Sequence, residues 1–441
     1  MRTMRQIGKH MTWLVGGIFL LAAAPALAAE PTNAELKAEL ETLKIKMGQM
    51  ESKLQQVGGA AAYQPPETGG SVLHVPGGEG VQISGFVDTS YSYNFNEPQT
   101  RTNTLRVFDT RAGDFMINNA ELVVEKPVSD ASRGGFRVDL DFGTDPEVVG
   151  SVTTGLGANN HTHGQNGETA VSDELELQQM YGEYLAPIGK GLDIKLGRFV
   201  TMHGAEVIES KDNWNFTRSL LFGYAIPFTH TGLRATYPWA DWLSTTVGVS
   251  NGWDVVDDNN QGKTVEVSAT VVPFEHASLT TTYMIGAEQN ADNGNPRNLL
   301  DIVASYQPMD PLQLKLNFDY GWEHDGTRLP NAGQEKNASW TGLAGYARYQ
   351  LCEKAALALR AEWLHDADGI RTAFTSGLNG VTGTDLQILE YTVTGEYKLT
   401  DHLLTRLEYR HDQASEHIFR NDDVGQRAYQ DTLSMEVIAP F

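Results

Sequence analysis

Charged and aromatic side chains mix in one stretch near the middle of the chain, residues 197–232, with the sequence GRFVTMHGAEVIESKDNWNFTRSLLFGYAIPFTHTG. Acids and bases held close together in a wet space could select small ions by their charge. A segment exposed to bulk solvent would have little use for the many apolar side chains between them, so we expect it to fold against a wall. The charged residues that we single out are Glu206, Glu209, Lys211, Asp212 and Arg218.

Other groups with chemical potential are weaker candidates. His161 and His163 have a spacing that could hold a transition metal, but no third ligand is near them in the sequence. The acidic run from Asp254 to Asn259 could attract calcium, but its spacing does not match a dedicated calcium loop. No Gly-x-Ser-x-Gly elbow, phosphate-binding loop or His-Glu-x-x-His pair is present. We therefore predict no enzyme, no catalytic residues, no bound metal and no cofactor.

The first 28 residues have the three parts of a secretory signal peptide. Basic residues from Arg2 to Lys9 precede an apolar run of Trp13–Ala24, which the small-residue sequence Ala26-Leu27-Ala28 follows. The apolar run is too short to span a bilayer as a helix, so we expect cleavage after Ala28. The net charge of −23 then becomes about −26, which argues against nucleic acid as a partner. The single cysteine, Cys352, excludes a disulfide framework.

Residues 32–57 show a helical pattern in which apolar residues recur every three or four positions. This narrow stripe is typical of a short coiled coil and implies partner chains, for which we prefer a homotrimer; the alternative is a single helix lying on another surface. Residues 58–80 are rich in glycine, alanine and proline and read as a flexible linker. The stripe consists of Leu36, Leu40, Leu43, Met47, Met50, Leu54 and Val57.

From Val81 onward, apolar and polar residues alternate with a period of two, which is typical of β-strands. Between Leu312 and Trp322, for example, leucine and aromatic residues occupy one face, while Gln313, Lys315, Asn317 and Asp319 occupy the other. The strands of soluble β-sandwiches usually have about five or six residues. These runs reach about ten, which is the length of a tilted membrane strand, and aromatic residues gather near their ends. The pattern predicts a barrel in the outer membrane.

We therefore predict an all-β fold over residues 81–441, a transmembrane antiparallel β-barrel of about sixteen strands, with about 14 to 18 allowed. Short turns, such as those expected at Pro238–Asp241 and Pro308–Pro311, alternate with long polar loops, so both chain ends and the coiled coil are expected in the periplasm. The terminal Phe441 ends an alternating strand and resembles the signal that barrel insertion machinery reads. The strands are expected to begin near residues 81, 114, 134, 174, 191, 226, 241, 263, 276, 298, 311, 339, 354, 385, 401 and 427.

A barrel of this width is too wide for opposite walls to fill it, so water enters unless something plugs it. Inward charges would be costly against lipid and suit a wet interior; alternatively, they pair with one another and stiffen the wall. By this count the third long loop, residues 202–225, folds inward and sets a constriction, so that changing Glu206 and Glu209 to Gln should alter ion selectivity. The alternatives are an outward flap or a latch between protomers. The predicted wall residues are Arg137, Asp139, Lys315, Arg360, Glu362, Arg406, Glu408 and Arg410.

Three runs in the sequence resemble a known family. The runs KLGRFVTMHGAEVIES, SLLFGYAIPFTHTG and VGVSNGWDVVDDNN are similar to the OmpL-like outer-membrane beta-barrel porins, also called porin family two. The resemblance covers residues 81–441 and implies a general porin without catalytic residues. A coiled coil followed by a barrel is also similar to the phosphate-selective porins, but this chain has no ladder of arginines and lysines to match them.

Two functions remain open at this point. The first is an outer-membrane porin through which small polar solutes and ions diffuse passively, with membrane lipid around it and no nucleic acid partner. The second is a structural or adhesive barrel with a plugged lumen and outer loops that bind a partner. The wet, charged interior favours the first.

Overall fold

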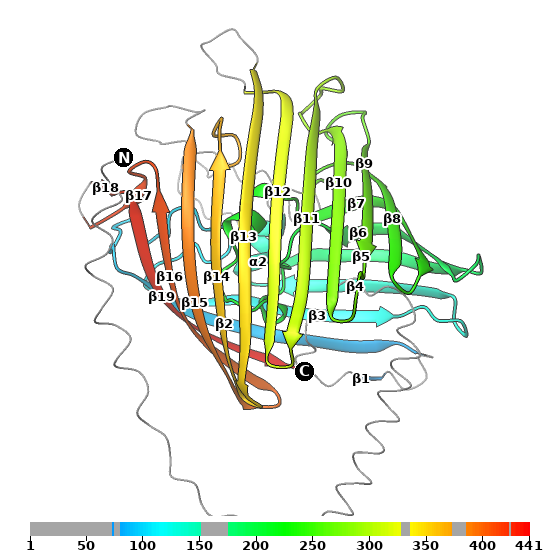
Figure 1. The fold of residues 1–441 in the computed structure, drawn as a ribbon, viewed down its shortest axis with the longest axis horizontal. Helices are drawn as coiled ribbons and strands as arrows, with labels where there is room; N and C mark the ends of the chain where they lie inside the picture. The colour runs from blue at the N-terminus through cyan, green and yellow to red at the C-terminus, as the bar shows by residue number, and fades with distance from the viewer. Residues whose placement is uncertain (1–72, 75–79, 151–174, 328–335, 373–384, 423–424) are drawn as a thin grey trace, which may run out of the picture. The chain divides into compact units, whose positions relative to one another are not determined.

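The computed structural model describes residues 73–74, 80–150, 175–327, 336–372, 385–422 and 425–441 (Figure 1). The predicted signal peptide and coiled-coil helix lie outside the described residues, as do His161, His163 and most of the predicted linker. The chain divides into two compact units, Met1–Gly58 and Gly59–Phe441. All the described residues belong to the second unit.

Antiparallel strands close into a ring in the second unit. Strands β2 to β16 pair in chain order, and the last strand, β19, pairs with β2 to close the barrel. The short strand β1 (Leu73–His74) adds to β2. The sixteen barrel strands are β2 (Gln82–Asn94), β3 (Asp114–Lys126), β4 (Gly134–Phe142), β5 (Leu175–Ala186), β6 (Leu192–Val200), β7 (Thr229–Ala240), β8 (Leu243–Ser250), β9 (Thr264–Val271), β10 (Ala277–Ala287), β11 (Pro296–Met309), β12 (Leu312–Thr327), β13 (Lys336–Cys352), β14 (Ala355–Asp366), β15 (Leu386–Thr400), β16 (Leu403–Ala414) and β19 (Tyr429–Pro440).

The predicted all-β barrel and its number of strands are confirmed, and each strand begins within three residues of the predicted position. Two boundaries differ because the chain continues through irregular pairing. The turn expected from Pro238 begins only after Ala240, and the turn expected from Pro308 begins only after Met309. The small hairpin of β17 (Phe419–Arg420) and β18 (Gln426–Arg427) lies in a loop and was not predicted.

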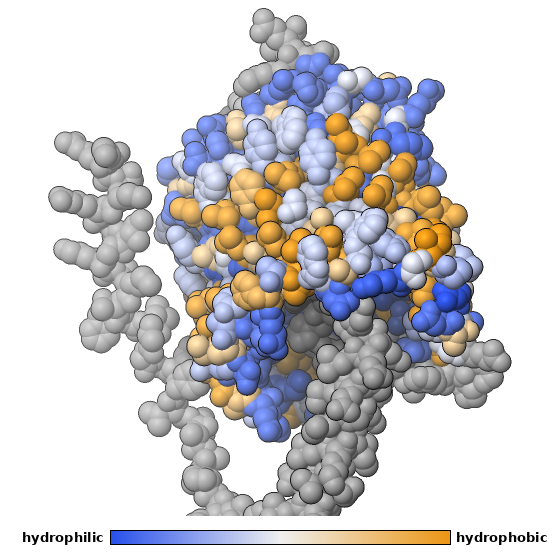
Figure 2. Space-filling view, turned by 45° about the vertical axis from the view of Figure 1, so that its right-hand side comes forward, coloured by the Kyte–Doolittle hydropathy of each residue, from blue (hydrophilic) through white to orange (hydrophobic). Residues whose placement is uncertain are grey.

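The two faces of each strand differ as the alternation predicts. In β12, Leu314, Leu316 and Tyr320 are exposed on the outside, whereas Asn317 and Asp319 are buried inside. Figure 2 shows hydrophobic residues gathered in a band across the outer wall, with hydrophilic residues above it. Such a band is what the hydrocarbon layer of a membrane requires. Among the described residues, no helix is long and apolar enough to cross a bilayer.

The end of the chain completes the closure of the ring. The backbone N–H of Phe441 donates to the carbonyl of Gly85 at 2.9 Å, and the N–H of Gly85 donates back at 3.1 Å. A Cβ atom at Gly85 would come within 2.6 Å of the Phe441 ring. Glycine at this position therefore lets the terminal aromatic side chain lie across the seam.

Short helical segments lie between strands. Helix α2 (Thr144–Gly150) follows β4 and contacts β3, β4 and β5. The connection between β6 and β7, residues 201–228, contains the 3-10 turn η2 (Ser210–Asp212) and the π-helical turn η3 (Leu221–Ala225). We call this connection the central loop.

Candidate functional site

The central loop, residues 201–228, is bonded to inward-facing side chains of the barrel wall. Its backbone or side chains form hydrogen bonds with residues of β5, β12, β13, β14, β15, β16 and β19. In the closed ring of sixteen strands, β5 and β13 are eight strands apart, so the loop reaches across the interior. Sequence alternation alone could not give these contacts, because loop and wall are far apart in the chain.

Two wall carboxylates hold the backbone of the loop. Glu362 accepts the N–H groups of Leu220 at 2.7 Å and Leu221 at 3.1 Å. Glu408 accepts the N–H groups of Phe216 at 2.7 Å and Thr217 at 3.0 Å. Each carboxylate therefore replaces water for two backbone donors that no strand or long helix satisfies. Hydrogen bonds to charged groups contribute about 1.5–3 kcal/mol each.

Arg360 forms the centre of a buried ion cluster beneath the loop. Its guanidinium is 2.8 Å from Glu206 and 3.2 Å from Glu390, and it also donates to the carbonyl of Thr217. Glu206 in turn accepts the N–H of Ser219 at 2.6 Å. Both Arg360 and Glu206 are buried, so Glu206 serves as an anchor of the loop and presents little charge to water.

Other wall cations bind carbonyl groups of the loop. Arg406 donates to Ser210 at 2.9 Å and to Asn213 at 2.6 Å. Arg410 donates to the carbonyl of Arg218 at 2.7 Å, and Lys315 donates to that of Ala205 at 3.1 Å. Of the predicted wall residues, Lys315, Arg360, Glu362, Arg406, Glu408 and Arg410 are thus all buried against the loop.

Apolar packing supports these polar contacts. Leu220, Leu221 and Phe222 belong to one cluster with Trp340 of β13 and Leu364 of β14, and all five are almost fully buried. The indole N–H of Trp340 also donates to the carbonyl of Ala225 at 3.0 Å. Burial contributes roughly 1.5–3 kcal/mol for each large apolar side chain. The apolar residues of the loop therefore pack inside the barrel.

The segment around η2 carries the charges that remain partly exposed. Glu209, Lys211 and Asp212 are half-buried, and Lys211 pairs with Asp212. The carboxylate of Glu209 accepts a hydrogen bond from Gln178 of β5 at 2.5 Å. It also has an oxygen within 4.8 Å of carboxylate oxygens of Glu121 on β3 and Asp139 on β4. An acidic patch thus forms where the loop meets these strands.

The remaining predicted wall residues belong to the same side of the barrel. Arg137 of β4 donates to Asp139 at 2.8 Å, and it lies 3.4 Å from Glu125 of β3. The side chain of Arg137 is 29% exposed, whereas that of Asp139 is fully buried. Arg137 is therefore the predicted wall cation with the clearest access to water.

Two cavities adjoin the loop at different ends of the barrel. A cavity of about 460 Å³ lies near the long connections, and its lining includes Phe228, Asp254 and Arg371. A second, of about 330 Å³, lies near the short turns, with Lys211, Arg348 and Lys354 in its lining.

The acidic run from Asp254 to Asn259, which was considered for calcium, has other partners in the structure. Asp254 accepts the N–H groups of Phe228 and Thr229, while Asp258 pairs with Lys263. These acids therefore do not converge on one point.

Arg218, the fifth predicted loop residue, joins the loop to helix α2. Its guanidinium lies 2.9 Å from Asp145 and 4.7 Å from the ring centre of Phe108. Burial raises the pKa of Asp145 to about 6, although the Arg218 charge opposes this shift. Asp145 and Arg218 therefore form an ion pair at neutral pH, and Asp145 loses its negative charge below about pH 6.

Asp145 should give the barrel a pH-dependent stability. Its pKa is higher when folded than the ordinary value of 3.8, so the folded state holds this proton more tightly. The free energy of unfolding should thus fall as the pH rises from about 4 to 6, by up to about 3 kcal/mol from this group. Urea titrations of wild type and Asp145→Asn across this range measure it as their difference. A difference that does not change with pH would contradict this assignment.

The structure brings most of the predicted loop and wall residues into contact, but sequence reasoning missed several of their partners. Glu390 and Glu436 were not singled out, although they pair with Arg360 and Arg406. Both residues occupy inward-facing positions in the alternation of β15 and β19, and this pattern could have identified them as wall residues. Asp145 gave no signal, because it lies in the connection after β4, outside the alternation of the strands. His203, His230 and Glu266, which also lie together, were likewise missed.

Comparison with protein families gives one match. The family model described as "Putative beta-barrel porin-2, OmpL-like" matches residues 80–441, which is most of the chain. A search of curated protein sequences found no match.

Solved structures share the fold at low sequence identity. OmpT of Vibrio cholerae, an outer membrane protein, is 9% identical with a TM-score of 0.51, over 84% of this chain and 100% of that one. An anion-selective porin from Comamonas acidovorans is 9% identical with a TM-score of 0.52, over 82% and 99%. The outer membrane channel DcaP of Acinetobacter baumannii is 12% identical with a TM-score of 0.50, over 86% and 100%. At such identities the likeness extends to the fold alone.

Proposed function

The chain belongs to the OmpL-like beta-barrel porin-2 family, and from this premise we propose that it is a passive outer-membrane channel narrowed by its central loop. Small polar solutes and ions would diffuse past the loop, between the cavity near the long connections and the cavity near the short turns. One observation carries this proposal: the central loop forms hydrogen bonds to walls on both sides of the interior. Its partly exposed charges lie on one side of the loop.

The acidic patch supports a preference for cations. Glu209 is the partly exposed member of this patch, whereas Glu121 is buried and Asp139 is buried and paired with Arg137. Lys211 is paired with Asp212. Carboxylates at a narrow wet passage attract cations and repel anions. The anchoring charges of the wall contribute less, because they are buried and paired within the protein.

The two loop glutamates should differ in their effect on selectivity. Changing Glu209 to Gln removes a half-buried charge; a unit charge about 8 Å from the ion path in water is worth about 0.5 kcal/mol, or roughly two-fold in the cation-to-anion ratio. Changing Glu206 to Gln should move this ratio less, because Glu206 is buried against Arg360. Reversal potentials in a potassium chloride gradient measure both.

The exposed turn residue Glu275 provides a matched control, since Glu275→Gln removes the same charge far from the loop contacts. Equal reversal potentials for wild type and the Glu209 variant would contradict the proposed role of Glu209 in ion selectivity. A larger shift from Glu206 than from Glu209 would show that the assignment of anchor and selector is reversed.

A second candidate function is a structural or adhesive barrel. The apolar cluster around Leu220, Leu221 and Trp340 favours it, because this cluster fills part of the interior. Single-channel recording of the mature protein in a planar bilayer separates the two functions. Discrete conductance steps support the porin, whereas inserted protein that stays silent supports the closed barrel.

We also propose a homotrimer and a role for Phe441 in membrane insertion. The heptad pattern of residues 32–57 supports the trimer, and so does a solved trimer form of OmpT from Vibrio cholerae, which has the same fold. The coiled coil would lie in the periplasm. Deleting residues 32–57 should reduce the trimer population in native mass spectrometry, and an unchanged trimer would exclude this role.

A further inference from the structure

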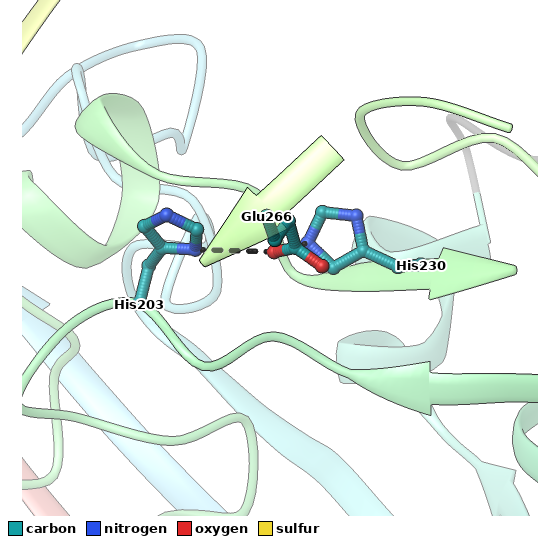
Figure 3. A group of neighbouring side chains, drawn as sticks. All are labelled: His203, His230 and Glu266. Carbon is teal, nitrogen blue, oxygen red and sulfur yellow. Dashed lines mark ion pairs between the residues drawn. The ribbon is translucent and has the colours of Figure 1, made fainter. Parts of the chain in front are cut away.

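Two histidines and a glutamate meet at the root of the central loop. His203 belongs to the loop, His230 to β7 and Glu266 to β9. All three side chains are buried. Figure 3 shows the carboxylate of Glu266 between the two imidazole rings. Its Oε1 lies 3.2 Å from Nε2 of His230 and 3.6 Å from Nδ1 of His203.

The hydrogen bonding around this cluster leaves lone pairs facing one another. Nδ1 of His230 lies 3.2 Å from the carbonyl of Gly252, to which it can only donate, so in the neutral ring Nε2 carries no proton. That nitrogen and both oxygens of Glu266 have no hydrogen-bond partner among the described residues. Two bare acceptors 3.2 Å apart repel each other, and a cation between them would convert this repulsion into binding.

The spacing fits a small metal ion. Ligand atoms bound at about 2.1 Å in a tetrahedral site are about 3.4 Å apart, and the two measured separations lie on either side of this value. One donor atom from each residue lies within 4.8 Å of the others. A metal-bound histidine ordinarily donates its second ring N–H to a carbonyl group, as His230 can to Gly252.

We propose that His203, His230 and Glu266 bind one divalent transition-metal ion. Two imidazole nitrogens and one carboxylate suit zinc and neighbouring metals, whereas calcium and magnesium prefer oxygen ligands. Arg234 lies 3.7 Å from the other oxygen of Glu266, so Oε1 is left for the ion. The added positive charge should keep affinity below that of closed structural zinc sites. The ion would join the root of the loop to β7 and β9.

Zinc content after refolding tests the proposal. Tag-free protein is refolded with zinc ions, excess metal is removed, and zinc is counted by inductively coupled plasma mass spectrometry. We expect about one zinc per wild-type chain and at least a ten-fold loss in Glu266→Gln and His230→Ala. The control His276→Ala, in an exposed turn, should keep its zinc. Heat-modified migration in gel electrophoresis shows that each variant has folded.

Cobalt provides an independent readout of the ligands. Wild-type protein loaded with cobalt should show the visible absorption of a four-coordinate site, and His203→Ala should lose it. Wild type without metal would overturn the proposal. Zinc retained equally in the Glu266 variant, or an unchanged cobalt spectrum in the His203 variant, would also overturn it. Because metal content is measured without conduction, a silent channel would not affect this test.

Discussion

Replacing Glu362 and Glu408 together by glutamine should release the central loop from the wall and raise the single-channel conductance. Each carboxylate accepts two backbone N–H groups of the loop, and glutamine offers an N–H₂ group where an acceptor is required. The narrowest part of a channel sets most of its resistance, so we expect an increase of roughly two-fold or more, with noisier open states. Recording in a planar bilayer measures both.

A matched double variant separates loop release from loss of charge. Glu125 and Glu183 are also wall carboxylates, but they pair with the wall cations Arg137 and Lys195. Changing both to glutamine removes the same charge and should leave the conductance within the ordinary spread of wild type. Equal effects of the two double variants would show that Glu362 and Glu408 do not hold the constriction.

Replacing Arg360 by methionine should cause the largest loss of stability. The fully buried guanidinium neutralises Glu206 and Glu390, lies 3.9 Å from Glu362, and binds the carbonyl of Thr217. Removing one partner of a buried ion cluster typically costs about 3–5 kcal/mol, because the remaining charges stay buried. Urea unfolding of the barrel in lipid vesicles measures the change in the free energy of unfolding.

Arg101 supplies the control for this prediction. It pairs with Asp114, and 61% of its side chain is exposed. An exposed pair contributes about 0–1 kcal/mol, so Arg101→Met should have little effect. If Arg360→Met were no more destabilising than Arg101→Met, the cluster would not anchor the loop energetically.

The barrel could be predicted from the sequence because its signal is local. Each strand alternates between lipid and interior, so a run such as Leu312–Trp322 reports its own structure without knowledge of its neighbours. Turns and long loops interrupt this alternation, which allowed the strand order and number to be read. Boundaries near Pro238 and Pro308 were misplaced, because irregular pairing accommodates proline within the sheet.

The candidate site could be predicted only in part. The sequence indicated which residues face inward and which loop is unusual in composition. It did not distinguish Glu206, which is buried in an ion pair, from Glu209, which stays half-buried. The two residues are three positions apart, and their surroundings come from different strands. Both are glutamates of the same loop, so residue type and spacing gave no reason to assign them different roles.

The sequence by itself determined the period of two, the acidic balance and a central loop rich in both charge and apolar residues. The tertiary structure decided which charges anchor that loop and which remain near water. Leu220 and Glu362 are 142 residues apart in the chain, and His203 reaches Glu266 only where the loop meets β9. The strength of an ion pair depends on distance and burial, and these follow from how the ring closes around the loop.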